Sequence, residues 1–186
     1  MFLPKFFPAP LGSSDLALKL IGLAARHLRP AQSSEQILGI VGFDEAACDL
    51  ALRAHRGFGM QVLVQSATPV AKDVLALFDG VQVPFDELLF QADVVSLHSA
   101  PCAMRPVMTG ARLDLMKPDA ILISATDRAL VDEDALAQSL MFDTIAGAAI
   151  TMAPDQTLHP MLAQCDTLVT LPTHSSIPVL PRPRVA

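Results

Sequence analysis

Short apolar runs of strand length alternate with helical segments along most of this chain. The strand-like runs, of the kind buried in a parallel sheet, lie at residues 37–42, 61–64, 81–83, 93–97, 120–123, 145–150 and 167–169. Helical patterns lie between them at residues 44–55, 85–90, 111–116 and 132–139, and the first of these helices is expected to end at Gly57. Strands and helices that alternate at this spacing predict an α/β fold, with a doubly wound parallel sheet in a single domain.

A further helix is predicted near the N-terminus, where an N-cap cluster at residues 13–15 precedes an apolar run over residues 16–28. Leucine, isoleucine and alanine cover most of its circumference, so this helix needs apolar partners on two sides. Residues 30–36 are polar and predict a linker. We therefore divide the chain into an N-terminal segment (1–13), one domain (14–174) and a loose, proline-containing tail (175–186).

Composition narrows the classes of partner. The 186 residues are 52% hydrophobic and only 17% charged, which predicts that some apolar surface meets a partner protein. The net charge is −6 and no basic run occurs, which argues against a nucleic-acid or anionic-membrane surface. Small molecules and proteins remain as the expected partners.

The cysteines and the N-terminus favour a cytoplasmic protein. Cys48, Cys102 and Cys165 are odd in number and far apart, so we interpret them as reduced, buried thiols rather than as disulfides or zinc ligands. The histidines at positions 27, 55, 98 and 159 have no metal-ligand spacing, and no metal site is expected. Residues 1–10 contain no continuous apolar stretch of membrane-spanning length.

Six motifs carry a resemblance to a known family. They lie at residues 38–42 (LGIVG), 57–60 (GFGM), 92–98 (ADVVSLH), 115–118 (LMKP), 130–136 (LVDEDAL) and 145–149 (IAGAA). With these motifs in this order, the chain resembles the NAD-binding domain of the D-isomer-specific 2-hydroxyacid dehydrogenases. The resemblance runs from about residue 14 to residue 174 and implies a Rossmann-like fold with NAD or NADP as cofactor. The sequence has no room for the family's substrate domain, so by itself it is expected to supply half of an active site.

The resemblance places the cofactor's phosphates at a loop whose glycines are partly replaced. In the family pattern G-x-G-x-x-G, this chain keeps Gly42 but has Asp44 at the second glycine and Ala47 at the third. The loop residues implied to face the cofactor are Gly42, Phe43, Asp44, Glu45 and Ala46, with Glu45 where relatives often have arginine. Two carboxylates here would repel a pyrophosphate. Alternatively, Asp44 caps the helix that begins here, and we favour this interpretation, with weakened or lost dinucleotide binding as its consequence.

The ribose position is also altered. Where the family has an acid that accepts hydrogen bonds from the ribose hydroxyls, this chain has Ser66, and no arginine follows in residues 65–69 to neutralise a 2′-phosphate. Neither NAD nor NADP is therefore favoured. The resemblance implies four further cofactor-facing positions, which are His98, Ala125, Thr126 and Thr151.

The catalytic positions of the family are changed as well. Asp127 stands at the position of the arginine that orients the substrate carboxylate, and Arg128 comes one residue later. Gln156 stands at the position of the glutamate that tunes the catalytic histidine, with Asp155 beside it as a substitute. His174 resembles the proton-transfer histidine itself.

Three functions stay open on these grounds. We favour a degenerate, noncatalytic relative that forms a homodimer through the helix at residues 14–28 and binds a nucleotide or a protein partner. The second is an active NAD-dependent oxidoreductase that acts on the CH–OH group of a 2-hydroxy acid through His174 and Asp155. The third is an interaction protein for which the sheet serves only as a scaffold.

Overall fold

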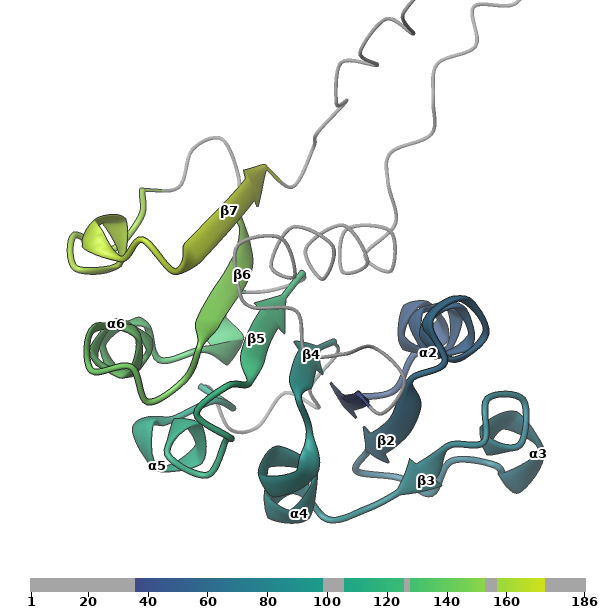
Figure 1. Cartoon of the computed structure of the whole chain (residues 1–186). Coiled ribbons are helices and arrows are strands. Elements are labelled where there is room, and N and C mark those ends of the chain that lie inside the picture. The colour runs from purple at the N-terminus through teal and green to yellow at the C-terminus, as the bar shows by residue number, and fades with distance from the viewer. Residues whose placement is uncertain (1–35, 99–105, 126–127, 153–156, 173–186) are drawn as a thin grey trace, which may run out of the picture.

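A computed structural model describes residues 36–98, 106–125, 128–152 and 157–172 of the chain. They form a sheet of seven parallel strands in the order β3-β2-β1-β4-β5-β6-β7 (Figure 1). The strands are β1 (Ile37–Val41), β2 (Gln61–Gln65), β3 (Val81–Gln82), β4 (Val94–Leu97), β5 (Ile121–Ser124), β6 (Gly147–Met152) and β7 (Leu168–Pro172). The predicted doubly wound parallel sheet, Rossmann-like in its strand order, is confirmed.

Helices cover both faces of this sheet. They are α2 (Glu45–Phe58), α3 (Lys72–Leu75), α4 (Phe85–Gln91), α5 (Gly110–Leu113) and α6 (Glu133–Met141), with short 3₁₀ turns η1 (Arg128–Leu130) and η2 (Leu162–Gln164). The helices α4, α5 and α6 lie along one side of the sheet, and α2 lies on the other (Figure 1). Three predicted segments lie outside the described residues: the helix at residues 14–28, the linker except for Gln36, and the tail.

Alternating side chains of the central strands pack into two separate hydrophobic cores, one on each face of the sheet. In β1, Leu38 and Ile40 point into the core beneath α2, while Val41 points into the core beneath α4, α5 and α6. Gly39, between Leu38 and Ile40, lies on the face of the sheet that packs against α4. A Cβ atom at Gly39 would lie only 2.5 Å from Leu88 Cδ2 and 2.9 Å from the Cβ of Ala92, so the absence of a side chain lets α4 lie directly against β1.

The boundaries of some elements differ from the predicted ones. Helix α2 continues through Gly57 and is capped instead by Gly59, which takes up the left-handed conformation (φ 67°) that ends a helix without a steric penalty. Strand β6 begins two residues later than predicted, because Ile145 is buried by core packing rather than by strand pairing. The short helix α3 was not predicted, since its four residues are too few to show helical periodicity.

Two thiols differ from the prediction in their burial. Cys48 and Cys165 are free, as expected, but both are half-buried at the edges of the two cores instead of fully enclosed. Burial is the leading cause that raises the pKa of each thiol, and a neighbouring aspartate raises it further. Cys102 lies outside the described residues. No helix in the described ranges has both the length and the apolar character needed to cross a membrane.

Candidate functional site

The carboxyl ends of three neighbouring strands bring the predicted cofactor residues to one edge of the sheet. Strand β1 pairs with β2 on one side and with β4 on the other, and Val41 is in register with both Gln65 and Leu97. The next residue of each strand is therefore at the same edge: Gly42 after β1, Ser66 after β2 and His98 after β4. Between β1 and β4 the strand order reverses direction, and this is where doubly wound sheets bind their ligands.

Gly42 turns the chain from β1 into α2. Its φ angle of 79° lies in the left-handed region, which glycine adopts without strain, and its N–H donates a hydrogen bond to the carbonyl of Gln65 over 2.9 Å. The next side chain, Phe43, packs into the core, with its ring centroid 6.2 Å from that of the buried Phe78. Phe43 therefore supports the loop from within the protein.

Asp44 is the N-cap of α2, which confirms the capping interpretation. Its backbone is extended, and its Oδ1 atom accepts a hydrogen bond of 2.8 Å from the N–H of Ala47. This N–H belongs to the first turn of the helix, whose free donors bind phosphate oxygens in dinucleotide sites. A carboxylate of the protein therefore already occupies one donor of the anion-binding end of α2. Ala46 is half-buried in the same turn, and Glu45 is exposed beside it.

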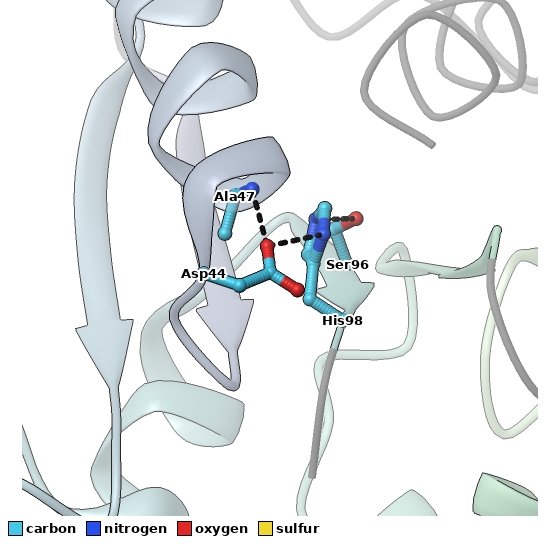
Figure 2. A network of polar contacts seen from close by, with 4 residues as sticks. All are labelled: Asp44, Ala47, Ser96 and His98. Carbon is cyan, nitrogen blue, oxygen red and sulfur yellow. Dashed lines mark hydrogen bonds and ion pairs between the residues drawn. The ribbon is translucent and has the colours of Figure 1, made fainter. Parts of the chain in front are cut away.

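Asp44 also faces a buried histidine. The Oδ1 atom of Asp44 lies 3.9 Å from Nδ1 of His98, and Nε2 of His98 lies 3.2 Å from Oγ of Ser96 (Figure 2). His98 is only 1% exposed and Ser96 is fully buried, whereas 39% of the Asp44 side chain is accessible. The three side chains thus form a row that leads from the solvent edge of the sheet into its interior.

Burial controls the protonation of this histidine. The loss of hydration lowers the pKa of His98 below its usual range, and the negative charge of Asp44 offsets only part of that effect. The imidazole is therefore neutral at pH 7. The neutral tautomer that suits both neighbours carries its proton on Nδ1, facing the carboxylate, and accepts a hydrogen bond from the Ser96 hydroxyl at Nε2.

Ser66 begins a loop that is held by a residue of the edge strand. The side-chain amide of Gln82 donates to the carbonyls of Ser66 (3.4 Å) and Thr68 (3.1 Å) and accepts from the N–H of Val70 (2.9 Å). The hydroxyl of Ser66 accepts from the N–H of Thr68 over 3.4 Å. The loop at the predicted ribose position is thus shaped by hydrogen bonds within the protein.

Two other predicted positions are enclosed. Ala125 belongs to the core beneath α2. Thr151 is buried, and its hydroxyl donates to the carbonyl of Ser124 across 3.5 Å, which ties β6 to β5. Neither side chain offers an accessible polar group to a ligand.

The predicted catalytic residues lie outside the described part of the chain. They are Asp127, Asp155, Gln156 and His174, and the same holds for the predicted cofactor contact Thr126. Arg128 follows at the start of η1. Within the described ranges, no group of three or more histidine, cysteine, aspartate or glutamate residues is placed to hold a metal ion.

Sequence reasoning missed two polar residues that shape this edge. Ser96 interrupts an otherwise apolar buried strand, and this single polar residue was the available signal. Gln82 gave no such signal, because a glutamine in a short edge strand is ordinarily solvated. Its role depends on the pairing of β3 with β2, which brings its amide over the loop.

The parallel sheet, the turn at Gly42 and the capped N-terminus of α2 together define a dinucleotide-binding type of domain. The family model for the NAD-binding domain of D-isomer specific 2-hydroxyacid dehydrogenases matches residues 21–176. This chain belongs to that family.

Its relatives in sequence are dehydrogenases and reductases. Glyoxylate reductase of Thermococcus litoralis is 38% identical over 122 residues, which cover 64% of this chain and 36% of that enzyme. (S)-sulfolactate dehydrogenase of Chromohalobacter salexigens is 34% identical over 148 residues, or 75% of this chain and 47% of the enzyme. The chain therefore spans less than half the length of these relatives.

Solved structures agree on the fold. A D-lactate dehydrogenase from Sporolactobacillus sp superimposes with a TM-score of 0.74 at 26% identity, covering 87% of this chain and 57% of the enzyme. The apo form of D-mandelate dehydrogenase from Rhodotorula graminis gives a TM-score of 0.76 at 20% identity, with 87% and 55% covered. The Rossmann-like architecture of the described sheet matches both.

Proposed function

We propose that this chain is a noncatalytic relative of the D-2-hydroxyacid dehydrogenases that binds NAD(H) weakly. The observation that carries the proposal is the carboxylate of Asp44, which accepts the Ala47 N–H at the start of α2 and remains 39% accessible. A cofactor phosphate bound in the manner of the family would have to displace this carboxylate from that N–H or lie beside it.

Electrostatics set the size of the expected effect. Two like unit charges about 4 Å apart near a protein surface repel each other by about 4 kcal/mol at an effective dielectric constant of about 20. Solvent screens an accessible carboxylate such as Asp44 and reduces that figure. We therefore expect Asp44 to weaken dinucleotide binding by about tenfold to about a hundredfold, equivalent to about 1.4 to about 2.8 kcal/mol.

The residues at the family's substrate-binding and catalytic positions support the same proposal. Asp127 stands at the position of the family's substrate-orienting arginine, and its charge would repel a carboxylate substrate. Gln156 stands at the position of the glutamate and cannot stabilise an imidazolium as a carboxylate does. Cofactor and substrate positions are thus altered independently, as relaxed selection on catalysis would leave them.

The competing function is an active NAD-dependent oxidoreductase. The observation that favours it is the family itself, since the relatives named above are reductases and dehydrogenases with 34–38% identity to this chain. In that case His174 would transfer the proton, and Asp155 would serve as its carboxylate partner.

Titration with NADH tests the cofactor part of the proposal. We expect a dissociation constant well above the micromolar range for the unaltered chain and tighter binding for Asp44→Asn, which keeps an N-cap side chain while it removes the charge. Asp49→Asn is the matched control, because it removes a negative charge from the same helix, where Asp49 forms an exposed ion pair with Arg53. A submicromolar constant for the unaltered chain would overturn the proposal.

Oxidation of NADH with 2-oxo acids at high protein concentration tests the catalytic part. We expect no turnover. Turnover that disappears in His174→Ala would establish the competing oxidoreductase instead.

A further inference from the structure

We propose that dinucleotide binding by this chain is coupled to the uptake of one proton at His98, so that the Asp44–His98–Ser96 row makes the cofactor site proton-dependent. This inference rests on the proposed weak binding of NAD(H) and identifies what regulates it. The family's loop has glycine where this chain has Asp44, so the coupling would be a property of this chain's own residues.

The geometry places a protonatable ring directly behind the anion site. His98 follows β4, Asp44 follows β1, and these strands are neighbours, so the imidazole reaches the carboxylate across the strand boundary at 3.9 Å (Figure 2). The same Oδ1 atom accepts the Ala47 N–H. A positive charge on His98 therefore raises the electrostatic potential at the place where a phosphate would meet the first turn of α2.

Among the described residues, Asp44 is the ionised group whose charge acts on His98, and it comes from the β1–α2 turn. Ser96, on strand β4 just before His98, is polar but does not ionise in this range. Glu45, the next acid along the chain, is exposed on the first turn of α2. A phosphate would thus add a second negative charge near Asp44.

The direction of the coupling follows from these charges. Burial keeps the pKa of His98 low in the free protein, so its imidazole is neutral. A bound pyrophosphate beside Asp44 stabilises the imidazolium, which raises that pKa and draws a proton from solvent. An imidazolium behind Asp44 also offsets the negative charge of this carboxylate and so weakens its repulsion of the phosphate. Binding is therefore stronger at low pH.

Ser96 allows a proton to be added at Nε2 of His98 without loss of the hydrogen bond between the two side chains. In the neutral tautomer the proton on Nδ1 faces Asp44, and Nε2 accepts from the serine hydroxyl. When Nε2 takes up a proton, the hydroxyl rotates and becomes the acceptor. A hydroxyl can both donate and accept a hydrogen bond, whereas an ionised carboxylate only accepts and an ammonium group only donates, so neither could replace Ser96 in both protonation states of His98.

The dissociation constant of NADH measured from about pH 5.5 to about pH 8.5 tests this coupling. We expect binding to strengthen as pH falls, by up to about tenfold per pH unit between the pKa values of His98 in the free and bound protein. His98→Gln should abolish the dependence. His55→Gln, which removes a half-buried histidine from the other end of α2, should retain it.

A second measurement uses the unaltered chain and does not depend on the folding of the His98→Gln variant. The His98 imidazole resonance, identified by elimination with variants of the other four histidines, is titrated with and without saturating NADH. We expect its pKa to rise on binding.

The outcomes separate the two proposals. A dissociation constant that does not change with pH, an unchanged His98 titration, or no detectable binding throughout this pH range would overturn the coupling and leave weak or lost binding standing. Submicromolar binding at the alkaline end would overturn the proposed function instead.

Discussion

At the scale of single residues, one carboxylate connects helix formation to ligand choice. Asp44 lowers the free energy of α2 by accepting the Ala47 N–H, an interaction typically worth about 1 kcal/mol, and it places negative charge at the same point. The buried His98 stands behind it and is neutral because charging it would require desolvation. Local stability and anion binding are therefore in competition at this residue.

The protonation of His98 gives a prediction for stability. Its pKa is lowered in the folded protein, so the unfolded chain binds a proton more readily below about pH 6.5. The neutral, buried His98 therefore lowers stability only at acid pH. Above about pH 6.5 the folded and unfolded chains both carry a neutral ring and no stability is lost, whereas the free energy of unfolding decreases as the pH falls toward the lower pKa of the folded state. Urea unfolding at about pH 7.5 and about pH 5.5 should show a larger loss for the unaltered chain than for His98→Gln. Equal losses in the two proteins would contradict the neutral, buried state of the ring.

At the scale of elements, Asp93 joins the beginnings of three strands. Its Oδ2 atom accepts the N–H of Ile37 at 2.7 Å, and its Oδ1 atom lies 2.7 Å from Nζ of Lys117. Its backbone carbonyl accepts the N–H of Ile121 at 3.0 Å. One residue thus links β1, β4 and β5 at the end of the sheet opposite to the candidate site. The register that aligns Gly42 with His98 begins here.

Removal of the Asp93 side chain should therefore be costly. Asp93→Ala leaves the Ile37 N–H and the Lys117 ammonium without their carboxylate partner, and we expect a loss of about 2 to about 3 kcal/mol in the free energy of unfolding. Asp49→Ala is the control, because its exposed ion pair with Arg53 is worth at most about 0.5 kcal/mol. Chemical denaturation measures both. Similar losses for the two variants would show that the strand junction does not depend on Asp93.

At the scale of the whole molecule, the two faces of the sheet carry separate cores, and α4, α5 and α6 share one of them. The assembly proposed from the sequence concerns the helix at residues 14–28, which lies outside the described residues. Its apolar circumference is the reason for the proposed homodimer, in which each copy presents the same surface to the other. The alternative is that the apolar residues 2–10 cover it within one chain.

Light scattering tests the dimer. The unaltered chain should have about twice the mass of the 19.8 kDa monomer, and Leu20→Asp should give monomer or aggregate because it places a charge in an apolar interface. Lys19→Asp is the control, since Lys19 lies on the polar side of the predicted helix and should leave the dimer intact. A mass of 19.8 kDa for the unaltered chain at every concentration would refute the homodimer.

The sequence by itself determined the order of the strands and of the longer helices, the parallel sheet and the cap at Asp44. Apolar runs and helical periodicity depend on neighbours only a few residues away, and the cap joins residues three positions apart. The placement of Gly42 and Ser66 just after strands followed from the same local patterns.

Only the tertiary structure decided what faces Asp44 and what holds the Ser66 loop. The contact of Asp44 with His98 exists because β1 lies beside β4, and the clamp by Gln82 exists because β3 pairs with β2. The burial of Thr151, at a position implied to face the cofactor, likewise depends on the pairing of β5 with β6. Such contacts join residues far apart in the chain, and their geometry is set by strand order and register, which no local pattern encodes.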